Sequence, residues 1–218
     1  MLREIGEHLS DSVSLIGTQF ALSPGLVRFW RSAHYQPVHL GTRKSRFAGA
    51  ISGLFLHSLD SSGEAVQSYA LARFGLQFPQ ALTRYYRSLQ TDIVRELLYG
   101  LPNLATLPEQ DVLEEVADYG FGRVGESSVI ASLTRCALWA LGQSGPGQNK
   151  LEYSRLIIQR TLQGRRWQYC TALSGDQGHR AGDNLLRQTF RSLIWAASPS
   201  LARNYQKQFS RTSHQGKD

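Results

Sequence analysis

The first sixty residues carry short apolar runs separated by turn-forming residues, a pattern typical of mixed α and β structure. Proline cannot donate to a β-ladder, so the strand that contains Pro37 is expected at the edge of a sheet. The sequence therefore predicts a small sheet at the start of the chain. Its predicted strands cover residues 12–20, 35–40 and 47–59.

A helix is predicted between the first two strands, over residues 24–33. Ser23 stands where this helix begins, and its hydroxyl can accept a hydrogen bond from a free N–H of the first turn. Pro24 follows at a position where a missing N–H costs nothing, because that group has no partner inside the helix. Serine followed by proline therefore predicts where the helix starts.

The rest of the chain is predicted to be mainly helical. Turn formers at residues 60–63 mark a boundary, and after them apolar residues recur at helical spacing. Thr106 and Glu109 match a capping box, in which the two side chains satisfy each other's backbone donors. The segment 167–173 is predicted as a short strand. The predicted helices cover residues 64–74, 79–90, 91–99, 109–119, 128–141, 151–162 and 183–196.

The fold class that follows is α+β, a partial sheet with flanking helices followed by a mainly helical domain. We expect a first domain over residues 1–60 and a helical domain over 61–198. Polar residues dominate after that point, so a disordered basic tail is expected over 199–218.

Composition excludes several classes of protein. Hydrophobic residues make up 41% of the chain, but no apolar run reaches the roughly 20 residues that a membrane span needs. No secretory signal is visible, and the two cysteines, Cys136 and Cys170, fit a reducing cytosol. Cys136 lies in an apolar run and is expected to be buried. No cysteine or histidine cluster predicts a metal site, so we expect a cytoplasmic protein without a metal.

Charge is distributed unevenly along the chain. The net charge is +7, yet residues 101–126 hold six acidic residues and one basic residue. Residues 127–218 hold thirteen Lys/Arg and four Asp/Glu, a surplus of +9. A basic half of this kind indicates either a polyanionic partner, most commonly nucleic acid, or a solvated basic surface.

One stretch carries a family resemblance. Residues 16–31, together with 38–41 and 45–56, resemble the end of the acetyltransferase domain in bacterial tRNA(Met) cytidine acetyltransferases. That family has a strand ending in Gly-x-Ser/Thr-Phe before a helix built on Leu-Trp-Arg-Phe-Trp, and residues 26–30 keep four of those five helix residues. Residues 178–187 are similar to a helix late in the family's tail.

The resemblance implies a GNAT-type domain in which the strand 12–20 is splayed from its neighbour and receives the pantetheine arm of acetyl-CoA. The family transfers the acetyl group to N4 of the wobble cytidine of elongator tRNA(Met). A helicase-like module couples ATP hydrolysis to that step. The implied partners are tRNA, expected to be elongator tRNA(Met), and the helicase and GNAT portion that precedes this region in the family.

The sequence departs from the family pattern in three places. The loop that cradles the CoA pyrophosphate is missing, since the lookalike at 143–147 is one residue short and contains a proline. No Gly-x4-Gly-Lys-Ser/Thr phosphate loop is present. The acidic residue and the arginine that hold acetyl-CoA in the family fall on Gly25 and Ser32. We therefore expect a truncated or split member that is inactive on its own.

Four residues near the predicted helix 24–33 are candidates for cofactor binding. The helix start at Ser23 aims backbone donors at electron-rich groups, including a developing oxyanion. Arg28 and Arg31 are placed to reach CoA phosphates or tRNA, or are plain surface arginines. Phe29 is either a wall of the acetyl-CoA pocket or part of the core.

The candidates for RNA binding are basic residues in three places. A turn with Arg43, Lys44 and Arg46 is expected to contact phosphate. Arg165 and Arg166 precede Trp167, which predicts phosphate binding with base stacking, or else a loop whose tryptophan is tucked into the core. Arg180 and Arg187 predict an RNA-facing stripe or a solvated helix face.

Three functions remain open from the sequence alone. The chain is part of a cytidine acetyltransferase, a tRNA-binding protein without chemistry, or a structural fragment. No residue is assigned as the catalytic base.

Overall fold

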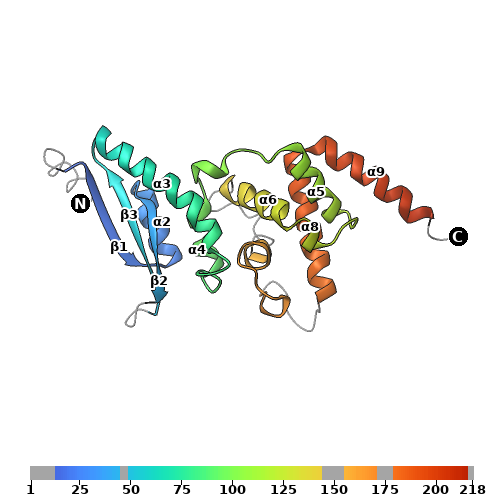
Figure 1. Ribbon diagram of the computed structural model, residues 1–218, viewed down its shortest axis with the longest axis horizontal. Helices are drawn as coiled ribbons and strands as arrows, with labels where there is room; N and C mark the ends of the chain where they lie inside the picture. The colour runs from blue at the N-terminus through green and yellow to red at the C-terminus, as the bar shows by residue number, and fades with distance from the viewer. Residues whose placement is uncertain (1–12, 45–48, 144–154, 171–178, 216–218) are drawn as a thin grey trace. The chain divides into compact units, whose positions relative to one another are not determined.

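The computed structural model describes residues 13–44, 49–143, 155–170 and 179–215. The chain forms two compact units, Met1–Asn103 and Leu104–Asp218 (Figure 1). The structure confirms the predicted α+β class, since a small antiparallel sheet with helices is followed by a mainly helical region. The units divide later than the boundary expected at residue 60, because the helix that follows residue 60 packs on the sheet.

The first unit is built on three antiparallel strands, β1 (Leu15–Ala21), β2 (Gln36–Lys44) and β3 (Ile51–Ser58). Their order in the sheet is β1-β3-β2, so the last strand lies in the middle (Figure 1). Pro37 therefore lies on an edge strand, as its missing N–H predicts. Phe55 on the central strand is fully buried and forms part of the core.

Within the described part of the chain, strand β1 is paired along one side. Leu15 lies opposite Ser58 and Ala21 opposite Ser52, so the pairing with β3 runs along the whole strand. Among the residues that the structure describes, no strand pairs with the other edge of β1. An edge strand of this kind carries backbone donors and acceptors that can pair with another extended group.

Helix α3 (Ser61–Ala81) corrects the prediction of two helices over 64–74 and 79–90. It begins at Asp60, whose carboxylate accepts a hydrogen bond from the N–H of Gly63 at 2.7 Å. Pro79 lies inside this helix instead of starting another. A proline leaves the carbonyl four residues earlier without its helical donor. That carbonyl belongs to Gly75, and the side-chain amide of Asn103 donates to it at 2.9 Å.

The described part of the first unit contains two further helices. Helix α2 (Pro24–Ser32) connects β1 to β2, and helix α4 (Thr91–Leu98) packs against α2. Both agree with the prediction. The short 3-10 turn η1 (Pro102–Leu104) follows α4.

The second unit is a helical bundle around helix α5 (Gln110–Gly120), which packs against α6, α8 and α9. Tyr119 on α5 and Phe190 on α8 are fully buried and meet edge to face, with ring centroids 6.0 Å apart. Cys136 on α6 is also fully buried, as predicted. The other elements are η2 (Glu126–Ser128), α6 (Ile130–Gln143), the π-helix η3 (Ile157–Leu162), η4 (Trp167–Tyr169), α8 (His179–Ala197) and α9 (Pro199–Gln215).

Three predictions for the second unit differ from the structure. The capping box was wrong, because Glu109 is the residue before α5, where its side chain makes no capping hydrogen bond, and its carboxylate pairs with Arg135. The strand expected at 167–173 was wrong where it is described, since Trp167 to Tyr169 form a 3-10 turn. Helix α9 lies where a disordered tail was expected, with Leu201 and Ala202 buried.

Candidate functional site

The start of helix α2 is capped as its sequence predicts. Ser23 is extended, with φ −139° and ψ 155°, and its hydroxyl accepts a hydrogen bond from the N–H of Leu26 at 3.3 Å. Pro24 occupies the first helical position. Only Leu22 separates this serine from the last residue of β1, so the helix N-terminus lies near the end of that strand. A helix N-terminus carries partial positive charge, which favours an electron-rich group.

The two aromatic residues of α2 have different environments. Trp30 stacks on Phe20 of β1, with ring centroids 6.0 Å apart, and meets Tyr35 edge to face at 4.9 Å. Phe29 is 52% exposed. Trp30 therefore anchors the helix to the sheet, while Phe29 offers an aromatic ring to solvent.

Arg28 and Arg31 both contact Glu96 on α4, a residue that the sequence did not single out. The Glu96 side chain is only 3% exposed, and Arg28 donates to its carboxylate at 3.2 Å. Arg31 donates to the Glu96 backbone carbonyl, and its guanidinium lies 5.6 Å from the centre of the Tyr99 ring. Arg95 lies 3.6 Å from the same carboxylate. Glu96 thus joins α2 to α4.

These contacts give the two arginines of α2 different roles. Burial lowers the pKa of Arg31, and the nearby Glu96 and Tyr99 partly oppose that shift. Arg31 therefore points into the first unit, where it donates a hydrogen bond to the Glu96 carbonyl. Arg28 stays 49% exposed while one nitrogen is held by Glu96. Of the two, Arg28 is the cation that the helix presents to solvent.

Strand β2 continues past residue 40, where it was expected to end, so Arg43 and Lys44 lie in the strand and not in the basic turn that was predicted. Arg43 is exposed on this strand, and Lys44 is its last residue. Arg46 lies outside the described residues. The structure therefore places one of the three candidate side chains, and that side chain faces solvent.

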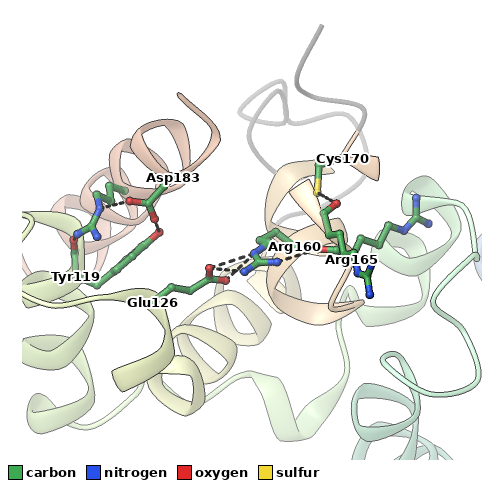
Figure 2. A network of polar contacts seen from close by, with 8 residues as sticks. Tyr119, Glu126, Arg160, Arg165, Cys170 and Asp183 are labelled. Atoms are coloured by element: carbon green, nitrogen blue, oxygen red, sulfur yellow. Dashed lines mark hydrogen bonds and ion pairs between the residues drawn. The ribbon is translucent and has the colours of Figure 1, made fainter. Parts of the chain in front are cut away.

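In the second unit, a chain of polar contacts surrounds Arg165. Arg160 on η3 forms a two-pronged ion pair with Glu126, with N···O distances of 2.9 and 2.7 Å (Figure 2). The same guanidinium donates to the backbone carbonyl of Arg165 at 3.0 Å and lies 4.6 Å from the centre of the Trp167 ring. Arg160 and Glu126 were not among the sequence candidates, because 34 residues separate them.

The segment Arg165–Trp167 adopts the second of the two structures that the sequence left open. Trp167 is 9% exposed, and its ring also meets His179 edge to face at 5.5 Å. It is therefore part of the core and unable to stack on a base. Arg165 is half-buried, and burial lowers its pKa. Arg166 is exposed.

The two candidate arginines of α8 also differ. Arg180, in the first turn, is exposed. Arg187 forms an ion pair with Asp183 at 2.7 Å and donates to the carbonyls of Tyr119 and Val124. Tyr119 in turn donates to Asp183 at 2.8 Å (Figure 2), and burial raises the pKa of this phenol. Arg187 thus uses its donors to hold α8 against α5.

Neither a cluster of metal ligands nor a membrane-spanning helix occurs among the described residues. No group of three or more histidine, cysteine, aspartate or glutamate side chains gathers among them. Within the same residues, no helix has both the length and the apolar character that crossing a membrane requires. The chemistry that the described arrangement supports is recognition of anions by exposed arginines.

The geometry alone does not indicate which class of protein the chain resembles, and comparison with known proteins does. The sequence matches no family model. It is 27% identical to a human RNA cytidine acetyltransferase over 51% of the chain. The chain is thus related to proteins named for acetylating cytidine in RNA.

Within that class, the longer matches are to tRNA(Met) cytidine acetyltransferases. The chain is 28% identical over 87% of its length to TmcA of Nitrosococcus halophilus, and 27% identical over 92% to TmcA of Vibrio cholerae. These matches confirm the resemblance read from residues 16–56. The chain spans 27% and 26% of the lengths of these two relatives.

Proposed function

We propose that this chain takes part in forming N4-acetylcytidine at the wobble position of elongator tRNA(Met), with acetyl-CoA as donor and ATP hydrolysis in another module. The observation that carries the proposal is the similarity to tRNA(Met) cytidine acetyltransferases over 87% and 92% of the chain. The names of those relatives supply cytidine acetylation and tRNA(Met). The N4 atom, the wobble position, acetyl-CoA and ATP are what the family resemblance implies. The geometry of each unit supplies what its residues contribute.

The first unit, in this proposal, is the closing part of a GNAT-type domain that binds acetyl-CoA. The open edge of β1 can pair with the amides of a pantetheine arm. The helix start at Ser23 aims backbone donors toward a thioester oxygen, where negative charge develops. Arg28, on the same helix, faces solvent and suits a phosphate group, and Phe29 suits an apolar or aromatic part of the ligand.

The chemical demand on such a site is mainly positional. The exocyclic amine of cytidine is a weak nucleophile, so rate depends on alignment with the thioester and on stabilising the oxyanion. Arg31 and Trp30 contribute by fixing α2 against α4 and the sheet. The residue that removes the proton is not assigned.

The RNA-facing residues, in this proposal, are Arg43 in the first unit and Arg166 and Arg180 in the second. All three are exposed. Guanidinium groups bind phosphate oxygens with good geometry, and the surplus of +9 over residues 127–218 favours a polyanion. Arg187 has an internal role in place of the RNA contact expected from the sequence, because its donors are engaged.

We further propose that the 218-residue chain transfers no acetyl group by itself. Its sequence contains neither a CoA pyrophosphate loop nor an ATPase phosphate loop. Calorimetry with acetyl-CoA checks this point. Weak or undetectable binding is expected, and micromolar affinity of the isolated chain contradicts it.

A tRNA-binding role without chemistry is the second candidate, favoured by the exposed arginines of the second unit and by the missing phosphate loops. Complementation separates the two. The Vibrio cholerae relative is shortened by its aligned 204 residues, and this chain is added separately with tRNA, acetyl-CoA and ATP. Recovery of N4-acetylcytidine supports the acetyltransferase role. Binding of tRNA without recovery supports the second candidate.

A further inference from the structure

The turn after η3 presents an exposed arginine and an exposed tyrosine next to each other. The N–H of Tyr169 donates to the carbonyl of Arg166 at 2.9 Å, which closes a four-residue turn. The first and last Cα atoms of such a turn lie within about 7 Å of each other. Tyr169 is 61% exposed, and Arg166 is exposed as well. A cation and an aromatic ring therefore reach solvent from neighbouring points.

This turn is held by contacts on its inner side. Arg160 donates to the Arg165 carbonyl at 3.0 Å, and the Arg165 N–H donates to the Gln159 carbonyl at 2.9 Å. Figure 2 shows Arg160 reaching from Glu126 to Arg165. Glu126 is 14% exposed, so the ion pair that fixes Arg160 is largely shielded from water. The backbone at Arg165 is thus held by a side chain, that of Arg160, and by a backbone carbonyl, that of Gln159.

The end of the turn is fixed in the same way. The Cys170 N–H donates to the Trp167 carbonyl at 3.0 Å, and its thiol donates to the Arg166 carbonyl at 3.5 Å. Trp167 is buried beneath Arg160 and His179. With its inner residue anchored, the turn keeps Arg166 and Tyr169 on the outside and lowers the cost of ordering the backbone on binding.

We propose that Arg166 and Tyr169 bind one unpaired nucleotide of RNA, with the phosphate on Arg166 and the base stacked on Tyr169. The proposal rests on the RNA-binding role proposed above and names the form of RNA that this site takes. An aromatic ring open on its face stacks on any base, whereas bases within a duplex are already stacked on each other. The site therefore prefers single-stranded RNA to duplex RNA.

The test compares variants of the whole 218-residue chain for binding to an unstructured 12-nucleotide RNA and to a 12-base-pair RNA duplex. Loss of one stacking contact is worth about 1–3 kcal/mol, so Tyr169→Leu is expected to weaken single-strand binding by about 5- to 150-fold. Tyr169→Phe keeps the ring and is expected to bind as the parent does. Tyr85→Leu is the matched control, since Tyr85 in the first unit is also exposed, at 49%, and lies beside an arginine.

Salt dependence separates stacking from charge. Arg166→Gln removes one phosphate contact and is expected to reduce the log–log salt slope by about 0.7, while Tyr169→Leu leaves the slope unchanged. Both side chains are exposed, so the substitutions are expected to leave the fold intact. Thermal unfolding checks that each variant is folded. If Tyr169→Leu and the parent bind single-stranded RNA equally well, the nucleotide site at Arg166 and Tyr169 is overturned, while the RNA-binding role of the chain stands. A parent chain that binds neither RNA overturns the RNA-binding role as well.

Discussion

Arg160 contacts both the backbone and the buried tryptophan of the turn around Arg166. It joins Glu126 to the Arg165 backbone and covers one face of Trp167, so one side chain links the Glu126 segment to the turn at residues 165–167. Replacing one partner of a shielded ion pair leaves the other charge without compensation. The proposed role of Arg160 is therefore to position the turn, whereas Arg166 and Tyr169 are the residues proposed to contact the RNA nucleotide.

Arg160→Gln is expected to destabilise the protein by about 2 kcal/mol, below the roughly 3–5 kcal/mol of fully buried pairs because Arg160 is 24% exposed. Urea unfolding measures this change. Arg135→Gln is the control, since Arg135 and Glu109 form an ion pair that is 53% and 58% exposed. Its loss is expected to cost less than about 1 kcal/mol. Equal costs for the two variants contradict the role given to Arg160.

At the scale of elements, α3 depends on two contacts made by its ends. Asp60 accepts from Gly63 at the first turn and from the Ser14 hydroxyl at 2.7 Å. The hydrogen bond from Gly63 is the larger cause that lowers the pKa of Asp60, followed by the one from Ser14. A carboxylate with a lowered pKa stabilises the fold above its unfolded pKa of about 3.9 and loses this effect as the pH falls.

Unfolding by urea at pH 7 and pH 3 tests that contribution. Stability is expected to fall on acidification, and Asp60→Asn is expected to reduce the size of the fall because asparagine caps helices without titrating. Glu64→Gln, which changes an exposed acid in the first turn of the same helix, serves as the control. An identical acid dependence in Asp60→Asn and the parent contradicts this account.

The other end of α3 depends on Asn103, which replaces the donor that Pro79 lacks. Asn103→Ala is expected to cost about 1 kcal/mol, since it leaves the Gly75 carbonyl without that hydrogen bond. In the presence of Pro79→Ala, whose N–H restores the helical donor, the same change is expected to cost less. A double-mutant cycle measured by thermal unfolding gives the coupling, and strict additivity contradicts it.

Local signals in the sequence predicted some elements and missed others for identifiable reasons. Helix α2 was predicted to within one residue, because Ser23 and Pro24 are neighbours of the backbone that they cap. The continuous α3 was missed, because the residue that compensates Pro79 is 28 positions from Gly75. Glu96 was missed for the same reason, since 68 positions separate it from Arg28. Spatial partners of this kind leave no periodic pattern.

At the scale of the whole molecule, binding to RNA is expected to depend on the sum of exposed cations. Contacts from Arg43, Arg166 and Arg180 to three phosphates predict a log–log salt slope of about −2 with single-stranded RNA. Filter binding at salt concentrations from about 50 to about 300 mM measures this slope. The Arg43→Gln and Arg180→Gln variants are each expected to make the slope shallower by about 0.7. A slope near zero contradicts phosphate recognition.

The central claim, that this chain works in cytidine acetylation, is tested most directly by a chimera. The chain replaces the aligned 204 residues of the Vibrio cholerae relative, and N4-acetylcytidine is quantified in elongator tRNA(Met) by mass spectrometry after incubation with acetyl-CoA and ATP. Acetylated cytidine above that of the relative lacking those residues is the predicted result. A folded chimera that binds tRNA yet forms no acetylcytidine contradicts the account.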